Sequence, residues 1–122
     1  MIDRQWAQAF AKDWIESWNS HDIDRILSHY TDDFELSSPL IVERLGLPEG
    51  KLKGKSAIAE YWLPSLSLRP PLQFELLDVF VGIEEITIYY NNVGRRVVAE
   101  TLLINSSGKA TRGIVQWSVA KI

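Results

Sequence analysis

The apolar positions at the start of the chain repeat with a helical period. Across residues 3–18, a rotation of about 100° per residue brings one set of apolar side chains onto a single arc, namely Ala7, Phe10, Ala11, Trp14 and Trp18. Asp3 is expected to cap the start of this helix, because its carboxylate can accept a hydrogen bond from an amide one turn later. The pattern therefore predicts a helix with one apolar side.

Two shorter helices are predicted to follow. Residues 19–22 are polar residues that compete for backbone hydrogen bonds, so the first helix should end there and either Ser20 or Asp22 should cap the second. Apolar residues then recur at offsets of 0, 3, 4 and 7 through about residue 30. Ser56 is expected to cap a third helix that ends or bends near Leu63, because Pro64 cannot continue the hydrogen-bond ladder.

Alternation with a period of two predicts strands in the rest of the chain. Residues 33–39 form one predicted strand, which ends at a proline and places Phe34, Leu36 and Ser38 on a single face. Residues 40–55 are rich in glycine and are expected to form an irregular loop, with at most short strands, that can cover a cavity mouth. Four further strands, at 74–81, 86–91, 96–104 and 111–120, are predicted to follow one another as antiparallel hairpins.

Several of these strands are apolar on both faces. In the strand at 96–104, one face carries Val97, Ala99, Thr101 and Leu103, and the other carries Val98, Glu100, Leu102 and Ile104. An antiparallel sheet covered only by its own helices should have one polar face. A second apolar face therefore favours a second cover, and we expect a homodimer that packs through the sheet.

Composition narrows the class of protein. A chain of 122 residues, 46% apolar and 24% charged, is expected to form a single domain over residues 1–122. Its net charge of −3 and the lack of a long basic cluster argue against a nucleic-acid partner. No apolar run is long enough for a membrane span or a secretory signal, so a cytoplasmic location is expected.

Metal and cofactor chemistry have little support in the sequence. The chain has no cysteine, and its two histidines, His21 and His29, are eight residues apart and form no zinc-binding motif. Gly54, Lys55 and Ser56 resemble the end of a phosphate-binding loop, but the glycine required five positions earlier is replaced by Glu49. No metal and no cofactor are expected.

The order of elements, together with four short motifs, resembles a known superfamily. The motifs are Trp18-Asn19-x-His21-Asp22, Tyr30-x-Asp32-Asp33-Phe34, Gly54-Lys55-Ser56 and Val98-Ala99-Glu100. Over nearly its whole length the chain is similar to the nuclear transport factor two-like superfamily and, within it, to SnoaL-like proteins, distant relatives of ketosteroid isomerase. The resemblance implies an α+β, cystatin-like fold: a cone-shaped, curved antiparallel sheet wrapped around the three helices of the N-terminal half, with an apolar cavity inside.

The same resemblance suggests which residues to compare with the isomerase. It places Trp14 where that enzyme has its oxyanion-binding tyrosine, Ser38 where it has its base, and Glu100 where it has a protonated carboxylic acid. Only Glu100 keeps a carboxyl group. Steroid isomerisation by that mechanism is therefore not expected, because tryptophan does not titrate usefully and serine alone is a poor base.

Three polar residues have two interpretations each. Glu100 either points inward as a desolvated acid or base, or faces solvent or an arginine such as Arg96 or Arg112. Asp78 shares its parity with apolar neighbours and is exposed only if a bulge or an edge position turns it outward. His29 either interacts with the last carbonyls of its helix or assists proton transfer.

These expectations combine into two hypotheses about function. The first is a SnoaL-like protein with a pocket for a small apolar molecule, and the second is a cofactor-independent isomerase, cyclase, dehydratase or hydrolase acting on an apolar carbonyl compound. Glu100 and His29 are the predicted catalytic residues. The predicted ligand-binding residues are Trp14, Trp18, Phe34, Ser38, Trp62 and Leu102. For Trp14 and Trp18, the alternative is that both indoles are core residues only.

Overall fold

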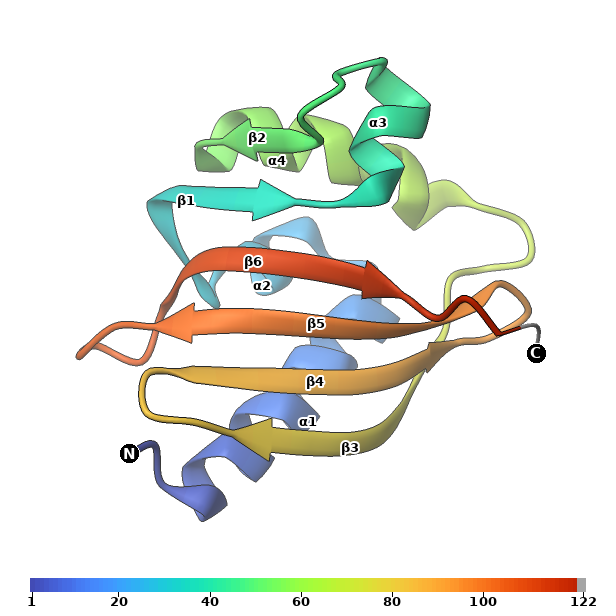
Figure 1. Ribbon diagram of the computed structural model, residues 1–122. Helices are drawn as coiled ribbons and strands as arrows, with labels where there is room; N and C mark the ends of the chain where they lie inside the picture. The colour runs from blue at the N-terminus through green and yellow to red at the C-terminus, as the bar shows by residue number, and fades with distance from the viewer. Residues whose placement is uncertain (121–122) are drawn as a thin grey trace.

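The computed structural model describes residues 1–120 and has an α+β architecture (Figure 1). Its helices are α1 (Arg4–Ser20), α2 (Ile23–Leu27), α3 (Pro39–Leu45), α4 (Lys55–Trp62) and the 3-10 helix η1 (Leu63–Ser67). Its strands are β1 (Tyr30–Ser37), β2 (Lys51–Lys53), β3 (Phe74–Val81), β4 (Glu85–Asn92), β5 (Arg96–Ile104) and β6 (Ala110–Trp117). They form one six-stranded curved sheet in the order β2-β1-β6-β5-β4-β3, in which only β1 and β6 are parallel.

Helix α1 crosses one face of the sheet, as Figure 1 shows. The side chain of Asp3 accepts a hydrogen bond from the amide of Trp6 at 2.8 Å, which confirms the predicted cap. The helix ends at His21, whose left-handed backbone lets its amide donate to the carbonyl of Trp18. Its buried side carries Ala7, Ala11, Trp14, Ile15, Ser17 and Trp18. None of the described helices is long and apolar enough to cross a membrane.

The polar turn after α1 fastens this helix to the first residues of the β3 region. The side-chain amide of Asn19 donates to the carbonyl of Phe74 at 2.9 Å and accepts from the Phe74 amide at 2.7 Å. His21 Nε2 donates to the carbonyl of Leu72 at 2.7 Å. Asp22, one of the two predicted caps, begins α2 by accepting from two amides of that helix. The motif at 18–22 is therefore structural.

Two boundaries near β1 differ from the prediction. Helix α2 ends at Leu27, and Tyr30 already lies in β1, where it pairs with Ala110 of β6. The amide of Ala110 donates to the carbonyl of His29 at 2.8 Å. Tyr30 fits the helical spacing of the preceding apolar residues, but pairing with β6 makes it the start of a strand. A short isolated helix has little stability of its own, so the strand pairing prevails.

Helix α3 is an element that the sequence analysis did not predict. Ser38 accepts a hydrogen bond from the amide of Leu40 and caps it, and Pro39 occupies the first turn, where its missing N–H is not needed. The sheet therefore packs with four α-helices rather than three. Helix α4 begins after Gly54 rather than after a Ser56 cap, and its end at Trp62 before Leu63 agrees with the predicted break.

The C-terminal strands confirm the predicted meander of hairpins, with β6 running over Ala110–Trp117 rather than 111–120. A register shift between Leu76 and Asp78 in edge strand β3 reverses which side chains face inward. As a result Phe74 is buried, whereas Asp78 and Phe80 are exposed. The interpretation of Asp78 as an exposed residue at a bulge is therefore confirmed.

Candidate functional site

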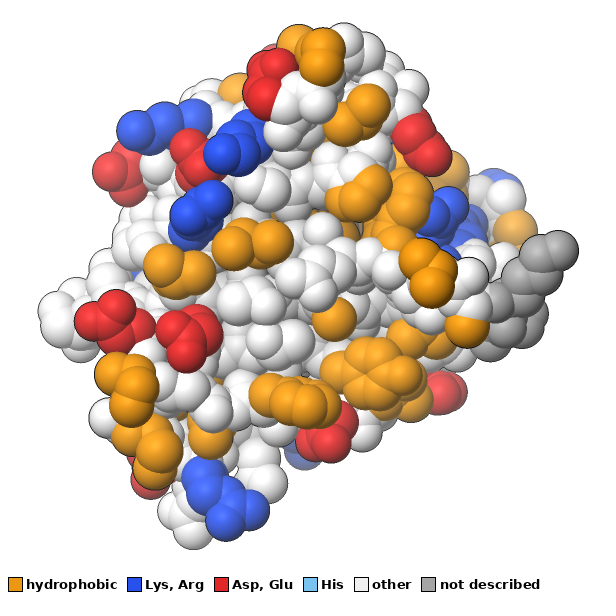
Figure 2. All heavy atoms as spheres, viewed as in Figure 1, with side chains coloured by type: hydrophobic (Ala, Val, Ile, Leu, Met, Phe, Trp, Pro, Cys, Tyr) orange, Lys and Arg blue, Asp and Glu red, His pale blue; other side chains and the backbone are white. Residues whose placement is uncertain are grey.

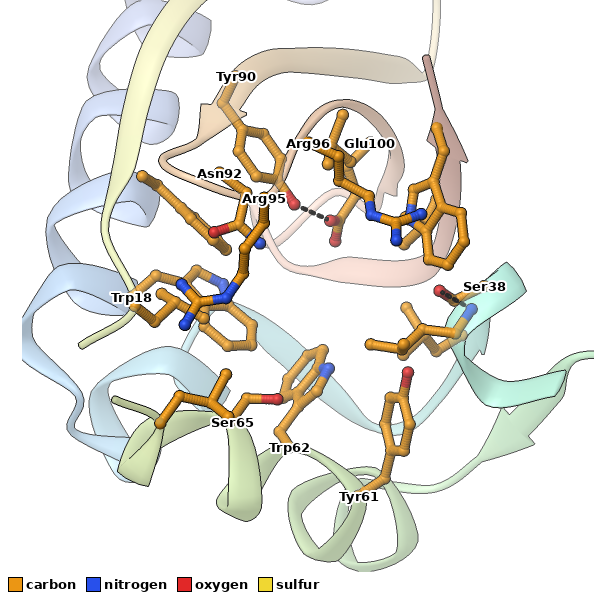
Figure 3. A pocket seen from close by; sticks show the side chains of 18 of the residues that line it. Trp18, Ser38, Tyr61, Trp62, Ser65, Tyr90, Asn92, Arg95, Arg96 and Glu100 are labelled. Atoms are coloured by element: carbon orange, nitrogen blue, oxygen red, sulfur yellow. Dashed lines mark hydrogen bonds between the residues drawn. The ribbon is translucent and has the colours of Figure 1, made fainter. Parts of the chain in front are cut away.

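A cavity of about 310 Å³ lies at one end of the sheet, between β4, β5 and β6 on one side and α1, α3, α4 and η1 on the other (Figure 3). That volume is at the lower end of the range for small-molecule sites. At this end of the sheet β1 and β6 end and β5 begins. Three residues at or next to these strand ends therefore line the cavity, namely Ser38, Trp117 and Arg96. A small organic molecule fits a space of this size.

Aromatic side chains form the apolar walls of the cavity. Trp18 of α1 contacts Trp62 of α4 edge-on, with ring centroids 4.8 Å apart, and lies 5.5 Å from Phe74 of β3. Both indoles are buried, with 5% and 6% of their surface exposed. Rigid aromatic walls of this kind favour a guest with flat apolar surface.

Glu100 of β5 is the single carboxyl group among the described residues that line the cavity. Its side chain is 5% exposed and accepts a hydrogen bond from the hydroxyl of Tyr90 at 3.1 Å (Figure 3). Burial raises the pKa of Glu100 from its ordinary value of 4.5 to about 7, and the Tyr90 hydroxyl opposes that shift. The group can therefore exist in either protonation state near neutral pH, as an acid–base catalyst requires.

The alternative that Glu100 is solvated or paired with an arginine is excluded by the arrangement of its neighbours. Arg112 lies 3.5 Å from Glu35 across the β1–β6 pair, and the guanidinium of Arg96 lies over the ring of Trp117, 3.4 Å from its centroid. Among the described residues, no cation lies within salt-bridge distance of Glu100. Gly113 of β6 lies behind it, where an added Cβ would come 3.2 Å from the side chain of Leu36 and 3.4 Å from that of Leu102.

Two hydroxyl groups complete the polar part of the cavity wall. Ser38 lines the cavity while its oxygen caps α3, so this side chain has a structural task as well. Tyr61 of α4 also lines it, and its hydroxyl points toward the interior in Figure 3. Burial raises the pKa of Tyr61, with the nearby Ser38 hydroxyl acting against the shift. Tyr61 is therefore a neutral hydrogen-bond donor at neutral pH.

The structure brings together only some of the residues predicted from the sequence. Trp18, Ser38, Trp62 and Glu100 line the cavity. Three expected wall residues, Trp14, Phe34 and Leu102, do not line it and instead fill the solid core behind it. Trp14 is fully buried and donates its indole N–H to the hydroxyl of Tyr30 at 2.8 Å, which fixes it inside the core.

His29 lies outside the cavity, so the expectation that it assists Glu100 there is wrong. Its Nε2 is 2.7 Å from the carboxylate of Asp13, and its Nδ1 is 3.1 Å from the carbonyl of Ile26. The hydrogen bond from His29 is the main cause that lowers the pKa of Asp13. His29 therefore joins α1 to α2, at the end of β1 opposite to the cavity.

Several cavity residues were missed from the sequence. Tyr90 has the parity of Ile86 and Ile88 on β4, so strand periodicity contains the signal that it points inward. Arg95 and Arg96 belong to the one short basic run of the chain. Arg44 gave no signal, because α3 itself was not predicted. No group of three or more histidine or acidic residues that could hold a metal occurs within residues 1–120.

We predict that Glu100→Gln changes how stability depends on pH. The folded chain retains a proton that the unfolded chain releases above about pH 4.5, so the free energy of unfolding should fall as pH rises through about 7, by roughly 3 kcal/mol in total. The free energy of unfolding of Glu100→Gln should not fall in this way, so the variant should be more stable than the wild type at about pH 8. Urea unfolding across this pH range measures the effect, with the exposed Glu75→Gln as control. Equal pH slopes for wild type and Glu100→Gln would contradict the raised pKa.

Comparisons with known proteins agree with this geometry. The SnoaL-like domain model matches residues 11–121. A SnoaL-like protein of unknown function from Burkholderia thailandensis is 36% identical, with a TM-score of 0.92 over 96% of this chain and 98% of that one. No curated protein matches the sequence.

More distant structures share the fold alone. SalBIII, an epoxide hydrolase/cyclase-like enzyme described in pyran ring formation in the polyether salinomycin, is 16% identical, with a TM-score of 0.74 over 98% of this chain and 95% of that one. A putative ketosteroid isomerase from Kribbella flavida is 11% identical, with a TM-score of 0.68 over 97% and 82%. Since the family model covers most of the sequence and the Burkholderia protein is similar over its full length, this chain belongs to the SnoaL-like domain family.

Proposed function

We propose that the protein binds a small, largely apolar molecule in the cavity between the sheet and the helices. The observation that carries this proposal is the cavity of about 310 Å³ walled by Trp18, Trp62 and Phe74. A guest with matching apolar surface would leave water and gain dispersion contacts with these aromatic walls on binding.

The test of this proposal uses a neutral aromatic ketone, 2-acetylnaphthalene, and isothermal titration calorimetry. Val115 of β6 lines the cavity beside Glu100, so Val115→Phe should fill part of the space and weaken binding by about tenfold or more. Ile83→Phe is the control, because Ile83 is exposed in the turn between β3 and β4 and makes no part of the cavity wall. Equal loss of affinity in both variants, or no effect of Val115→Phe, would place the ketone elsewhere.

A second candidate function, proton transfer on a carbonyl compound, is favoured by Glu100. A buried carboxyl with a pKa of about 7 and no cationic partner destabilises the fold at neutral pH, and such groups are typical of acid–base sites. As a carboxylate, Glu100 would take a proton from the carbon next to the carbonyl. The C–H electron pair would form the enolate double bond and the carbonyl electrons would move to oxygen, where Tyr61 can donate a hydrogen bond. Return of the proton to the same or another atom completes the cycle.

Two fold neighbours add support to this candidate, since one is described as a hydrolase/cyclase-like enzyme and another as a putative isomerase. Both are under 25% identical to this chain, so they support a cavity on this fold that can host such chemistry and say nothing of the substrate.

We predict that the protein accelerates exchange of the methyl protons of 2-acetylnaphthalene with solvent deuterium, followed by proton nuclear magnetic resonance. Glu100→Gln should reduce the exchange rate by about a hundredfold or more, because glutamine keeps the shape and the acceptor for Tyr90 but cannot take a proton. Its affinity for the ketone should change little. If the ketone binds and exchange stays at the rate of buffer for both proteins, the binding function stands and the catalytic one is wrong.

We also propose that two copies pair through the face of the sheet turned away from α1. Figure 2 shows this face, with hydrophobic side chains over β3 and β4. Phe80 is 56% exposed and Tyr89 is 38% exposed, and both side chains stand on this face. A shallow hollow of about 180 Å³ lies next to them, between Tyr89, Val97 and Ala99.

The expected outcome is a dimer in sedimentation equilibrium that Tyr89→Lys converts to a monomer, because a buried unpaired ammonium is costly at an interface. Ile83→Lys is the matched control, since Ile83 is 70% exposed in the turn between β3 and β4. A monomeric wild type, or a dimer that persists in Tyr89→Lys, would rule out this interface.

A further inference from the structure

Three arginines reach the cavity that otherwise has aromatic walls. Arg44 comes from α3, Arg95 from the turn between β4 and β5, and Arg96 from the first position of β5. Figure 3 shows Arg95 extending toward Trp18 and Arg96 on the far side of the cavity. They reach the same cavity from two parts of the chain, α3 and the start of β5, in a protein with a net charge of −3.

Each guanidinium is held in place by at least one contact, and that of Arg44 also lies over the ring of Tyr61, 5.9 Å from its centroid. Nη2 of Arg95 donates to the carbonyl of Pro70 at 2.9 Å, and Nη1 of Arg44 donates to the hydroxyl of Ser65 at 2.8 Å. Arg96 lies flat on the indole of Trp117 at 3.4 Å. Because a guanidinium has five N–H donors, every one of the three keeps several donors for another partner.

No acid among the described residues neutralises these charges. Within residues 1–120, none of the three arginines is within salt-bridge distance of a carboxylate. The single carboxyl group that lines the cavity is Glu100, which is hydrogen-bonded to Tyr90. The cavity thus combines an apolar interior with positively charged groups whose positions are already fixed, and fixed donors bind an anion at a low cost in side-chain entropy.

We infer that the ligand of this cavity is a small aromatic or aliphatic carboxylate, with its apolar body against Trp18 and Trp62 and its carboxylate held by Arg44, Arg95 and Arg96. This inference rests on the proposed binding function. It specifies that the largely apolar ligand has an anionic end. A carboxylate matches the planar fork of a guanidinium, which can hold both oxygens at once. The arginines also fix the orientation of the guest, because its carboxylate must remain next to a guanidinium group.

The test compares matched pairs of ligands by isothermal titration calorimetry. One pair is 2-naphthoate and 2-acetylnaphthalene, and a smaller pair is benzoate and acetophenone. In each pair the wild type should bind the carboxylate about tenfold or more tightly than the ketone, and higher ionic strength should reduce this preference. The double variant Arg95→Gln/Arg96→Gln should lose the preference while keeping its affinity for the ketone. Arg4→Gln is the control, because Arg4 is exposed in α1 and makes no part of the cavity wall.

The outcomes separate this inference from the function on which it rests. If wild type binds ketone and carboxylate equally, or if the preference survives in the double variant, the inference is wrong and the binding function stands. If Val115→Phe leaves the affinity for every ligand unchanged, the proposed cavity site itself is wrong. Tighter binding of 2-naphthyl phosphate than of 2-naphthoate would overturn the assignment of a carboxylate.

Discussion

The packing of Trp14 between α1 and the sheet is the interaction on which the other features depend. This indole is fully buried and contacts the rings of Phe74 on β3 and Tyr90 on β4, with centroids 5.9 and 5.3 Å away. An indole can be buried at low cost only if its N–H finds an acceptor, and the hydroxyl of Tyr30 on β1 supplies one. One side chain therefore holds together a helix and three strands that lie far apart in the sequence.

The filled core around Trp14 adjoins the cavity, because Phe74 and Tyr90 contact Trp14 and also line the cavity wall. Phe34 and Leu102 belong to the filled core, whereas the cavity lies between Ser38, just after the end of β1, and Trp117, at the end of β6. Glu100 lies at the boundary between the filled and the open part. Its carboxyl group loses hydration without gaining a cationic partner, which raises its pKa and lowers stability at neutral pH. A fold commonly accepts such a cost at a site that acts on a ligand.

The polar groups of the cavity lie in two separate regions, one on the sheet and one on exposed segments. This separation makes the two sides of the cavity chemically different. Glu100 and Tyr90 belong to the inward face of the sheet and are buried. Arg44, in α3, and Arg95, in the β4–β5 turn, are exposed. A guest held by its charged end at the arginines presents its remaining surface to the aromatic walls and to Glu100. In the two proposals above, the arginines orient the ligand and Glu100 transfers the proton.

The sequence by itself determined the elements whose side chains obey one strong period: α1 with its Asp3 cap, the hairpins of β3 to β5, and the parity that Glu100 shares with Val98 and Leu102. Those patterns reflect local geometry, so they are visible without any tertiary contact. Helix α3, the strand pairing of Tyr30 and the place of His29 were decided by the tertiary structure. A one-dimensional pattern shows that Trp14, Trp18 and Trp62 are buried, but which of them borders empty space depends on how the layers fill it. That Arg44 lines the same cavity as the neighbouring Arg95 and Arg96 likewise depends on the tertiary structure, which periodicity does not record.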